Sequence, residues 1–123
     1  MDTSIKSHED LRIWIQAREL VGTVYRLTES FPTKELFELS SQMRRAAISV
    51  VSNIAEGAAR GSTKEFIRFL YISSGSLAEL DTQILLSVDL NYHSENDIYE
   101  IRKCIASLRG QIYMTIRSLQ KRL

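Results

Sequence analysis

The residue types that most often carry catalysis are few in this sequence, and they lie far apart. It contains two histidines, His8 and His93, and one cysteine, Cys104. Because the three lie on unrelated segments, no Cys/His pair is placed for nucleophilic catalysis. Neither histidine has the spacing to a second His or Cys that a zinc site uses, and the Glu-x-x-His motif of di-iron bundles is missing. We therefore expect no catalytic residue, no metal and no cofactor.

The segment from Ser40 to Arg60 carries chemistry of another kind, because it combines two stripes at helical spacing. The apolar stripe consists of Met43, Ala47, Val50 and Ile54. The second stripe is polar and mostly short, and consists of Arg45, Ser49, Ser52, Asn53 and Glu56. An ordinary surface helix carries long charged side chains on its second face. Short polar groups instead let another helix approach closely, which indicates an interaction surface.

Four helices must position these residues. Apolar residues recur every three or four positions over about 10–30, 40–57, 63–90 and 95–121, which is typical of amphipathic helices. Gly57 is expected to end the second helix. The segment STKE at 62–65 is expected to form a capping box at the start of the third helix, and Ser94 is placed to cap the fourth. The short connections make sequential helices antiparallel. The sequence therefore predicts an all-α, up-down-up-down four-helix bundle that forms a single domain over residues 1–123.

Length and composition agree with one soluble domain. The chain has 123 residues, 44% of them hydrophobic and 25% charged, which is enough for its own core. No apolar run reaches the roughly 18 residues of a membrane span, and the polar start at 1–7 is unlike a signal peptide. The lone Cys104 excludes an internal disulfide, fits a reducing cytosol and is expected to be a small core residue. We expect a cytoplasmic protein with no membrane partner and no evident small-molecule substrate.

Counting residues from the turn near Gly57 predicts the contacts between the second and third helices. Arg44 or Arg45 should come level with Glu79 and form an ion pair with it. Ser49 should come level with Tyr71 to Ser73, near the small residues at 73–76. A glycine inside a helix costs about 1 kcal/mol relative to alanine, so Gly75 is expected to allow a close backbone approach.

Charge is distributed unevenly along the chain. The net charge is +1, yet residues 69–100 hold six acids and no Lys or Arg, whereas residues 101–123 hold six bases and no acid. We expect a basic pole at one end of the bundle, formed by Arg60, Lys64, Arg68, Arg117, Lys121 and Arg122. The opposite, acidic pole gathers Glu38, Asp89, Glu95, Asp97 and Glu100. These charges either complement the helix dipole of the fourth helix or form a patch that contacts phosphates.

Several blocks of sequence resemble one known family. These blocks are LRIW at 11–14, FP at 31–32, the segment QMRRAAIS at 42–49, SNIAEG at 52–57 with Arg60, EFIRFL at 65–70 and GSLAEL at 75–80. They are similar to the four-helix bundle proteins encoded within 23S rRNA intervening sequences. The resemblance implies an up-and-down bundle assembled as a homopentameric ring. The accessory protein of diversity-generating retroelements, a relative of that family, shares the ringed bundle and binds nucleic acid through a far more basic surface.

Two hypotheses follow. The first is a non-enzymatic homo-oligomeric scaffold whose contacts involve Arg44, Arg45, Ser49, Ser52, Asn53, Glu56, Gly75 and Glu79. The alternative is an RNA- or DNA-binding accessory module that uses the basic pole.

Overall fold

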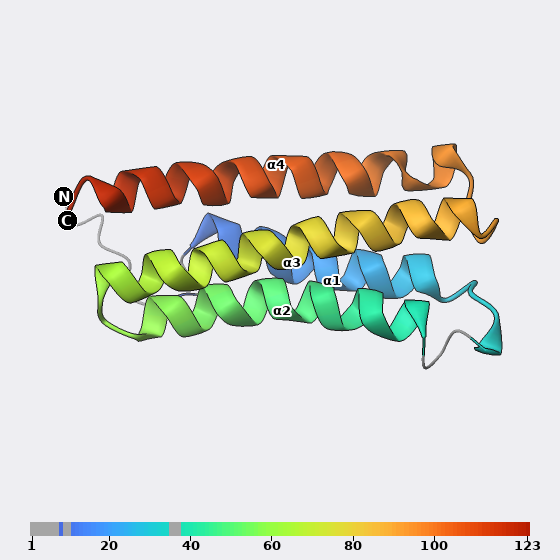
Figure 1. The fold of residues 1–123 in the computed structure, drawn as a ribbon, viewed down its shortest axis with the longest axis horizontal. Helices are drawn as coiled ribbons and strands as arrows, with labels where there is room; N and C mark the ends of the chain where they lie inside the picture. Colours follow the sequence, from blue (N-terminus) through green and yellow to red (C-terminus); the bar gives the residue numbers. More distant parts are fainter. Residues whose placement is uncertain (1–7, 9–10, 35–37) are drawn as a thin grey trace.

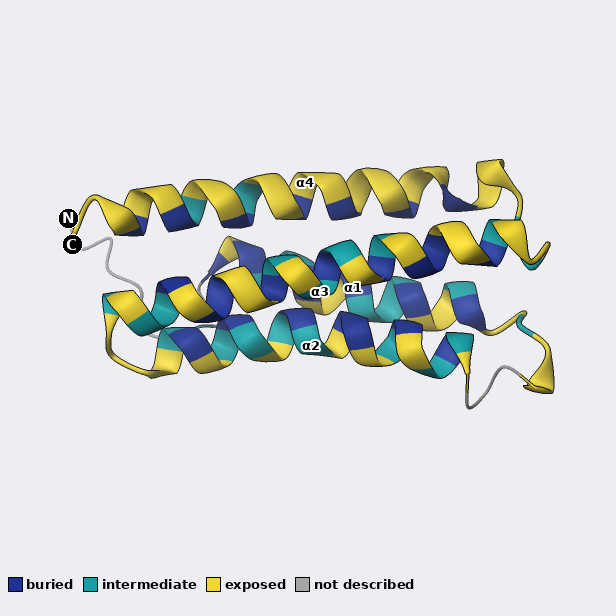
Figure 2. Ribbon diagram, in the orientation of Figure 1, coloured by how far each residue is buried: buried dark blue, intermediate teal, exposed yellow. Residues whose placement is uncertain are grey.

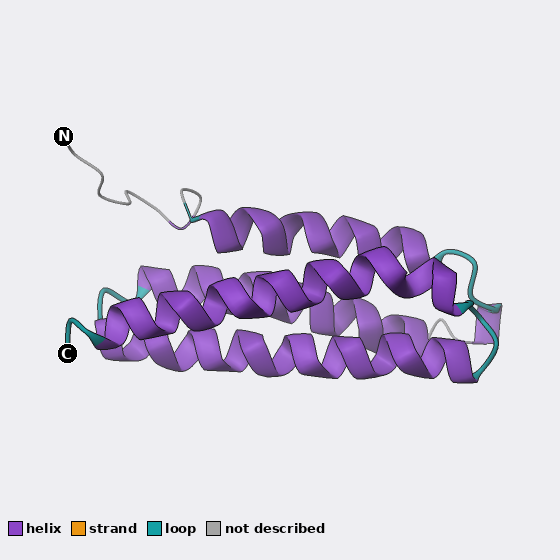
Figure 3. Ribbon diagram, turned by 90° about the horizontal axis from the view of Figure 1, so that it is seen from above, coloured by secondary structure: helices purple, strands orange, loops and turns teal. Residues whose placement is uncertain are grey.

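Four α-helices make up almost all of the described chain (Figure 1). The computed structural model describes residue 8, residues 11–34 and residues 38–123. The helices are α1 (Arg12–Thr28), α2 (Leu39–Ala59), α3 (Thr63–Asp89) and α4 (Glu95–Gln120). No strand occurs within these ranges, as Figure 3 shows. The fold class is therefore all-α, as predicted, and each helix begins and ends within two residues of its predicted bounds.

The helices run alternately up and down, and each contacts two others. The contacting pairs are α1 with α2, α2 with α3, α3 with α4, and α1 with α4. The connections between α2 and α3 and between α3 and α4 each span only a few residues. Connections of this length return the chain beside the helix it has just left, which gives the antiparallel arrangement seen in Figure 1.

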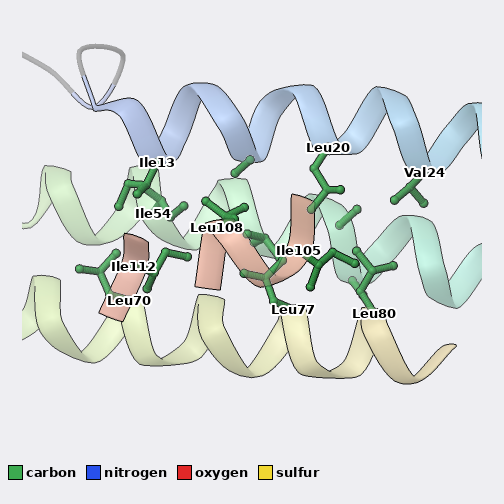
Figure 4. Packing of buried hydrophobic residues seen from close by; sticks show 14 of the residues in the cluster. Ile13, Leu20, Val24, Ile54, Leu70, Leu77, Leu80, Ile105, Leu108 and Ile112 are labelled. Atoms are coloured by element: carbon green, nitrogen blue, oxygen red, sulfur yellow. The ribbon is translucent and has the colours of Figure 1, made fainter. Parts of the chain in front are cut away.

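The core is a continuous cluster of aliphatic side chains from all four helices (Figure 4). The predicted apolar stripe of α2 is fully enclosed, with Met43, Ala47, Val50 and Ile54 all at 0% exposure. On α4 the buried residues follow the predicted spacing from Ile98 to Leu119. Only one side of each helix is buried, and the outward side of α4 is exposed along its whole length (Figure 2). This one-sided burial is the arrangement that period-3.6 patterning predicts.

The predicted end of α2 at Gly57 is wrong. The helix continues to Ala59, and the residue with left-handed backbone geometry is Gly61, at φ 69°. Gly57 is buried inside the helix, where an added Cβ would lie only 2.6 Å from Phe69 Cβ. Its lack of a side chain therefore lets α2 pack closely on α3.

The predicted cap serines of α3 and α4 both accept a backbone hydrogen bond, but only α4 has the reciprocal bond of a capping box, so the box predicted at residues 62–65 is only half formed. Ser62 Oγ accepts a hydrogen bond from the backbone N–H of Glu65 at 3.3 Å. At α4, Ser94 Oγ accepts from the Asp97 N–H at 3.2 Å, and the Asp97 carboxylate accepts from the Ser94 N–H at 2.9 Å. This reciprocal pair is a capping box. Hydrogen bonding from Ser94 lowers the pKa of Asp97 below its usual range.

Cys104 lies on the exposed side of α4, so the prediction that it belongs to the core is wrong. The neighbouring Ile101, Ile105 and Leu108 define the buried side of this helix, and Cys104 precedes Ile105 by one residue. One residue turns a helix by about 100°, because there are 3.6 residues per turn.

None of the described helices is long and apolar enough to cross a bilayer.

Candidate interaction surfaces

The seam between α2 and α3 is held by short polar side chains. Ser49 Oγ and Ser76 Oγ are hydrogen-bonded at 2.9 Å. Asn53 Nδ2 donates to Ser49 Oγ at 3.0 Å and to the Ser49 carbonyl at 2.8 Å. The buried Ser73 hydroxyl donates to the carbonyl of Val50 at 2.9 Å. Part of the polar stripe of α2 therefore meets a close helix, as predicted, and that helix is α3 of the same chain.

The predicted ion pair between Arg44 or Arg45 and Glu79 does not form. Arg44 turns toward α1, where its Nε donates to Thr28 Oγ1 at 2.8 Å and its guanidinium lies 4.5 Å from the centre of the Tyr25 ring. Glu79 Oε1 instead accepts from Gln83 Nε2 at 3.3 Å. Arg45 is exposed and has no ion-pair partner within the described ranges. Arg44 therefore ties α2 to α1, while Arg45 remains available at the surface.

Gly75 does not serve a close approach inside the chain. It is exposed, and no atom lies within 4 Å of the position that a Cβ would take. The close approach is made at Gly57, one helix away. Counting along the sequence placed Ser49 level with residues 71–73, about one helical turn from its actual partner Ser76. It also did not identify which glycine lies at the helix contact.

The outward sides of α2 and α3 combine charged and apolar side chains, and we call this surface the outer α2–α3 strip. It consists of Arg45, Ile48 and Ser52 on α2 and of Ile72, Glu79 and Leu86 on α3, all of them exposed. Ile48, Ile72 and Leu86 are 42%, 40% and 43% exposed. Sequence reasoning missed these three residues. Their signal was an apolar residue lying outside the core-facing row of its helix.

The basic pole forms at the end of the bundle where α2 joins α3 and where α4 ends (Figure 1). Two of its six members are already paired: Arg60 with Glu56 at 3.0 Å, and Arg68 with Glu65 at 3.0 Å. Both guanidiniums also lie over the Phe69 ring, at 5.0 and 4.5 Å from its centre. The hydrogen bond from Arg68 lowers the pKa of Glu65 and raises that of Arg68.

Four exposed bases therefore remain at the basic pole without an ion pair inside the described part of the chain. They are Lys64, Arg117, Lys121 and Arg122. At the other end of the bundle, where α2 begins and α3 meets α4, lie the members of the acidic pole Glu38, Asp89, Glu95 and Asp97. The predicted separation of charge along the bundle is thus present.

Neither histidine lies in a chemical cluster. The ring of His8 packs edge-on against that of Trp14, with 5.1 Å between the ring centres. The ring centre of His93 lies 5.1 Å from that of Phe31, and His93 Nδ1 lies 3.3 Å from Ser87 Oγ. No group of His, Cys, Asp and Glu side chains able to hold a metal occurs in the described residues. A shallow depression along α1 is lined by residues of that single helix, and so it lacks polar groups that converge from several elements.

The fold and its surfaces define a small all-helical bundle protein built on one continuous core. The chain belongs to the 23S rRNA-intervening sequence protein family, whose profile matches residues 9–114. No curated protein matches the sequence.

Proposed function

We propose that this protein is a non-enzymatic, homo-oligomeric scaffold of the 23S rRNA-intervening sequence protein type, assembled as a pentameric ring. Its work is to present repeated helical surfaces, and no step of it requires a cofactor or a small-molecule substrate. Residues of the α2–α3 region form the contacts between subunits, among them Arg45, Ser52, Glu56 and Glu79. Ring assembly by one repeated contact requires a heterologous interface, in which two different patches of each subunit meet.

The outer α2–α3 strip is the observation that supports this proposal. Exposed isoleucine and leucine side chains lie there beside Arg45, which has no ion-pair partner in the described chain. Apolar side chains spaced along two neighbouring helices are typical of association surfaces when charged residues border them. Burying Ile48, Ile72 and Leu86 against another subunit would remove apolar area from water, which stabilises association by about 25 cal/mol for each Å² buried.

Light scattering behind a sizing column tests the assembly. A pentamer has about five times the chain mass of 14.1 kDa, and a clean monomer at micromolar concentration contradicts the proposal. Ile72→Glu is expected to dissociate the oligomer without unfolding the subunit, because the side chain is exposed. Ser107→Glu places the same charge on an exposed position of α4, away from the outer α2–α3 strip, and serves as the matched control.

A second candidate function is nucleic-acid binding by the basic pole. The four unpaired bases at that end support it, and repetition around a ring would multiply a weak contact through avidity. Affinity for a structured RNA should then fall steeply with salt. Charge reversal at Arg60, Lys64, Arg117 and Lys121 should abolish it. An absence of binding at low salt would eliminate this function.

A further inference from the structure

Three exposed tyrosines lie on the outward side formed by α3 and α4. Tyr71, Tyr99 and Tyr113 are 50%, 60% and 56% exposed. The ion pair between Arg102 and Asp81, at 2.9 Å, fixes which levels of α4 and α3 lie side by side. Counted from that pair on antiparallel helices, Tyr71 and Tyr113 come to the same level. Tyr99 and Tyr113 lie three positions before and eleven positions after Arg102, so both occupy the α3 side of α4.

The tyrosines of α4 alternate with bases along one exposed row. This row, which we call the α4 row, consists of Tyr99, Lys103, Ala106, Gly110, Tyr113, Arg117 and Lys121. Its members recur at intervals of three or four residues, and all are exposed. No acid occurs between residues 101 and 123, and Lys103, Arg117 and Lys121 have no ion pair with any described residue. Lys103 lies 5.3 Å from the centre of the Tyr99 ring.

Small residues occupy several positions in the middle of this surface. Gly75 and Gly110 lie almost level on the two helices, by the register that Asp81 and Arg102 set. An added Cβ would meet no atom within 4 Å at either glycine, so packing inside the chain does not require them. Ala106 and Ala78 continue the small residues toward Tyr99. Along the α4 row, the two tyrosines thus lie on either side of the short residues Ala106 and Gly110.

From this arrangement we infer that the α4 row, together with Tyr71, binds single-stranded nucleic acid. Bases stack on the tyrosine rings, and Lys103, Arg117 and Lys121 contact phosphates. Stacking on aromatic side chains combined with a basic track is how proteins bind single strands without reading sequence. Tyr99 and Tyr113 are separated by about 21 Å at 1.5 Å per residue, so a bound strand must pass over several nucleotides to place a base on each ring. The inference rests on nucleic-acid binding, the second function proposed above, and it moves the main contact with the nucleic acid from the end of the bundle to its side.

Fluorescence anisotropy with labelled twelve-nucleotide probes tests the inference on the full-length chain. Oligouridylate and oligothymidylate arms distinguish RNA from DNA, and a duplex of the same length is the comparison. Three phosphate contacts predict that affinity for the single strand falls about 20-fold between 50 and 200 mM salt. Tyr99→Ala and Tyr113→Ala should each weaken binding at least about fivefold, with unchanged thermal unfolding because both rings are exposed. Arg26→Ala, an exposed arginine on α1, is the matched control for Lys103→Ala.

The outcomes separate this inference from the proposals above. Binding that is lost in Lys64→Glu but retained in the Tyr99→Ala, Tyr113→Ala double variant overturns the inference and leaves the basic pole as the binding surface. Binding no tighter to the single strand than to the duplex also overturns it. No binding of any probe at 50 mM salt overturns both this inference and the proposal that the basic pole binds nucleic acid. If the double variant changes the oligomeric mass while binding stays the same, the surface is a contact between copies of the chain and the inference is wrong.

Discussion

Replacing Gly57 with alanine should destabilise the bundle, although the same change inside a helix is ordinarily stabilising. Helix propensity favours alanine by about 1 kcal/mol. Against this, the new Cβ would lie 2.6 Å from Phe69 Cβ and 3.2 Å from Phe66 Cδ1. Since Phe69 Cβ is bonded directly to the backbone, α2 and α3 must separate by about 1 Å to relieve the contact. Overpacking of this kind costs about 1–3 kcal/mol, which cancels or exceeds the gain in propensity.

A second glycine supplies the control that isolates the packing cost. Gly110 also lies inside a helix, but an added Cβ there meets nothing within 4 Å, so Gly110→Ala should gain the full propensity benefit. The difference in unfolding free energy between the two variants is then the overpacking cost alone. Each kcal/mol corresponds to roughly 4 °C in a domain of this size, so Gly57→Ala should melt about 4–12 °C below Gly110→Ala.

Thermal unfolding followed by far-ultraviolet circular dichroism measures this difference, and urea unfolding provides the free energies independently. Both variants should retain the helical content of the parent protein. If Gly57→Ala melts at or above the temperature of Gly110→Ala, then α2 and α3 do not approach each other as described, and the account of Gly57 as a packing residue fails.

Three further predictions follow from other contacts. Arg44→Ala should lower the urea unfolding free energy by about 1–2 kcal/mol, since it removes the hydrogen bond to Thr28 and the contact with the Tyr25 ring. Arg26→Ala, at an exposed position, should change it by less than about 0.5 kcal/mol, and equal effects of the two variants would contradict the role of Arg44 in tying α2 to α1. The pKa of Asp97 is lowered in the folded state, so its contribution to folding stability is present above the unfolded pKa of about 4 and is lost as pH falls through the lower folded value. The urea unfolding midpoint should therefore fall less steeply below pH 4 in Asp97→Asn than in the parent protein, and an unchanged profile would refute this. Ser49→Leu should cost about 1–3 kcal/mol by overpacking the α2–α3 seam, and calorimetric melting identical to that of the parent would show that this position is ordinary surface.

The helices and the core were predictable because both depend on a local repeat. Apolar residues at three- and four-residue intervals identify a buried side regardless of what packs against it. The level of Ser49 on α3 was predictable to within about one helical turn, since counting from one short turn gives the approximate level of residues on adjacent helices. The same counting could not assign Arg44. Neighbouring positions differ by about 100° around the helix, and one residue decides whether a side chain faces α1, α3 or water.

Whether a side chain outside the core-facing row is exposed depends on how the helices pack together, and no local sequence pattern determines that. Gly57 and Gly75 both read as mid-helix or helix-end glycines, yet only Gly57 lies against a second helix. The exposed Ile72 and Tyr113 could not be separated from core residues by type. Which of these side chains remain exposed was settled by the relative rotation of the helices.

The exposure of Cys104 has a practical consequence for every experiment on assembly. As the single cysteine of the chain, it can join two copies through a disulfide in air, so masses measured without reductant would include covalent dimers. Under reducing conditions the same thiol accepts one fluorophore per chain. Energy transfer between donor- and acceptor-labelled copies would then report exchange of subunits without any change of sequence.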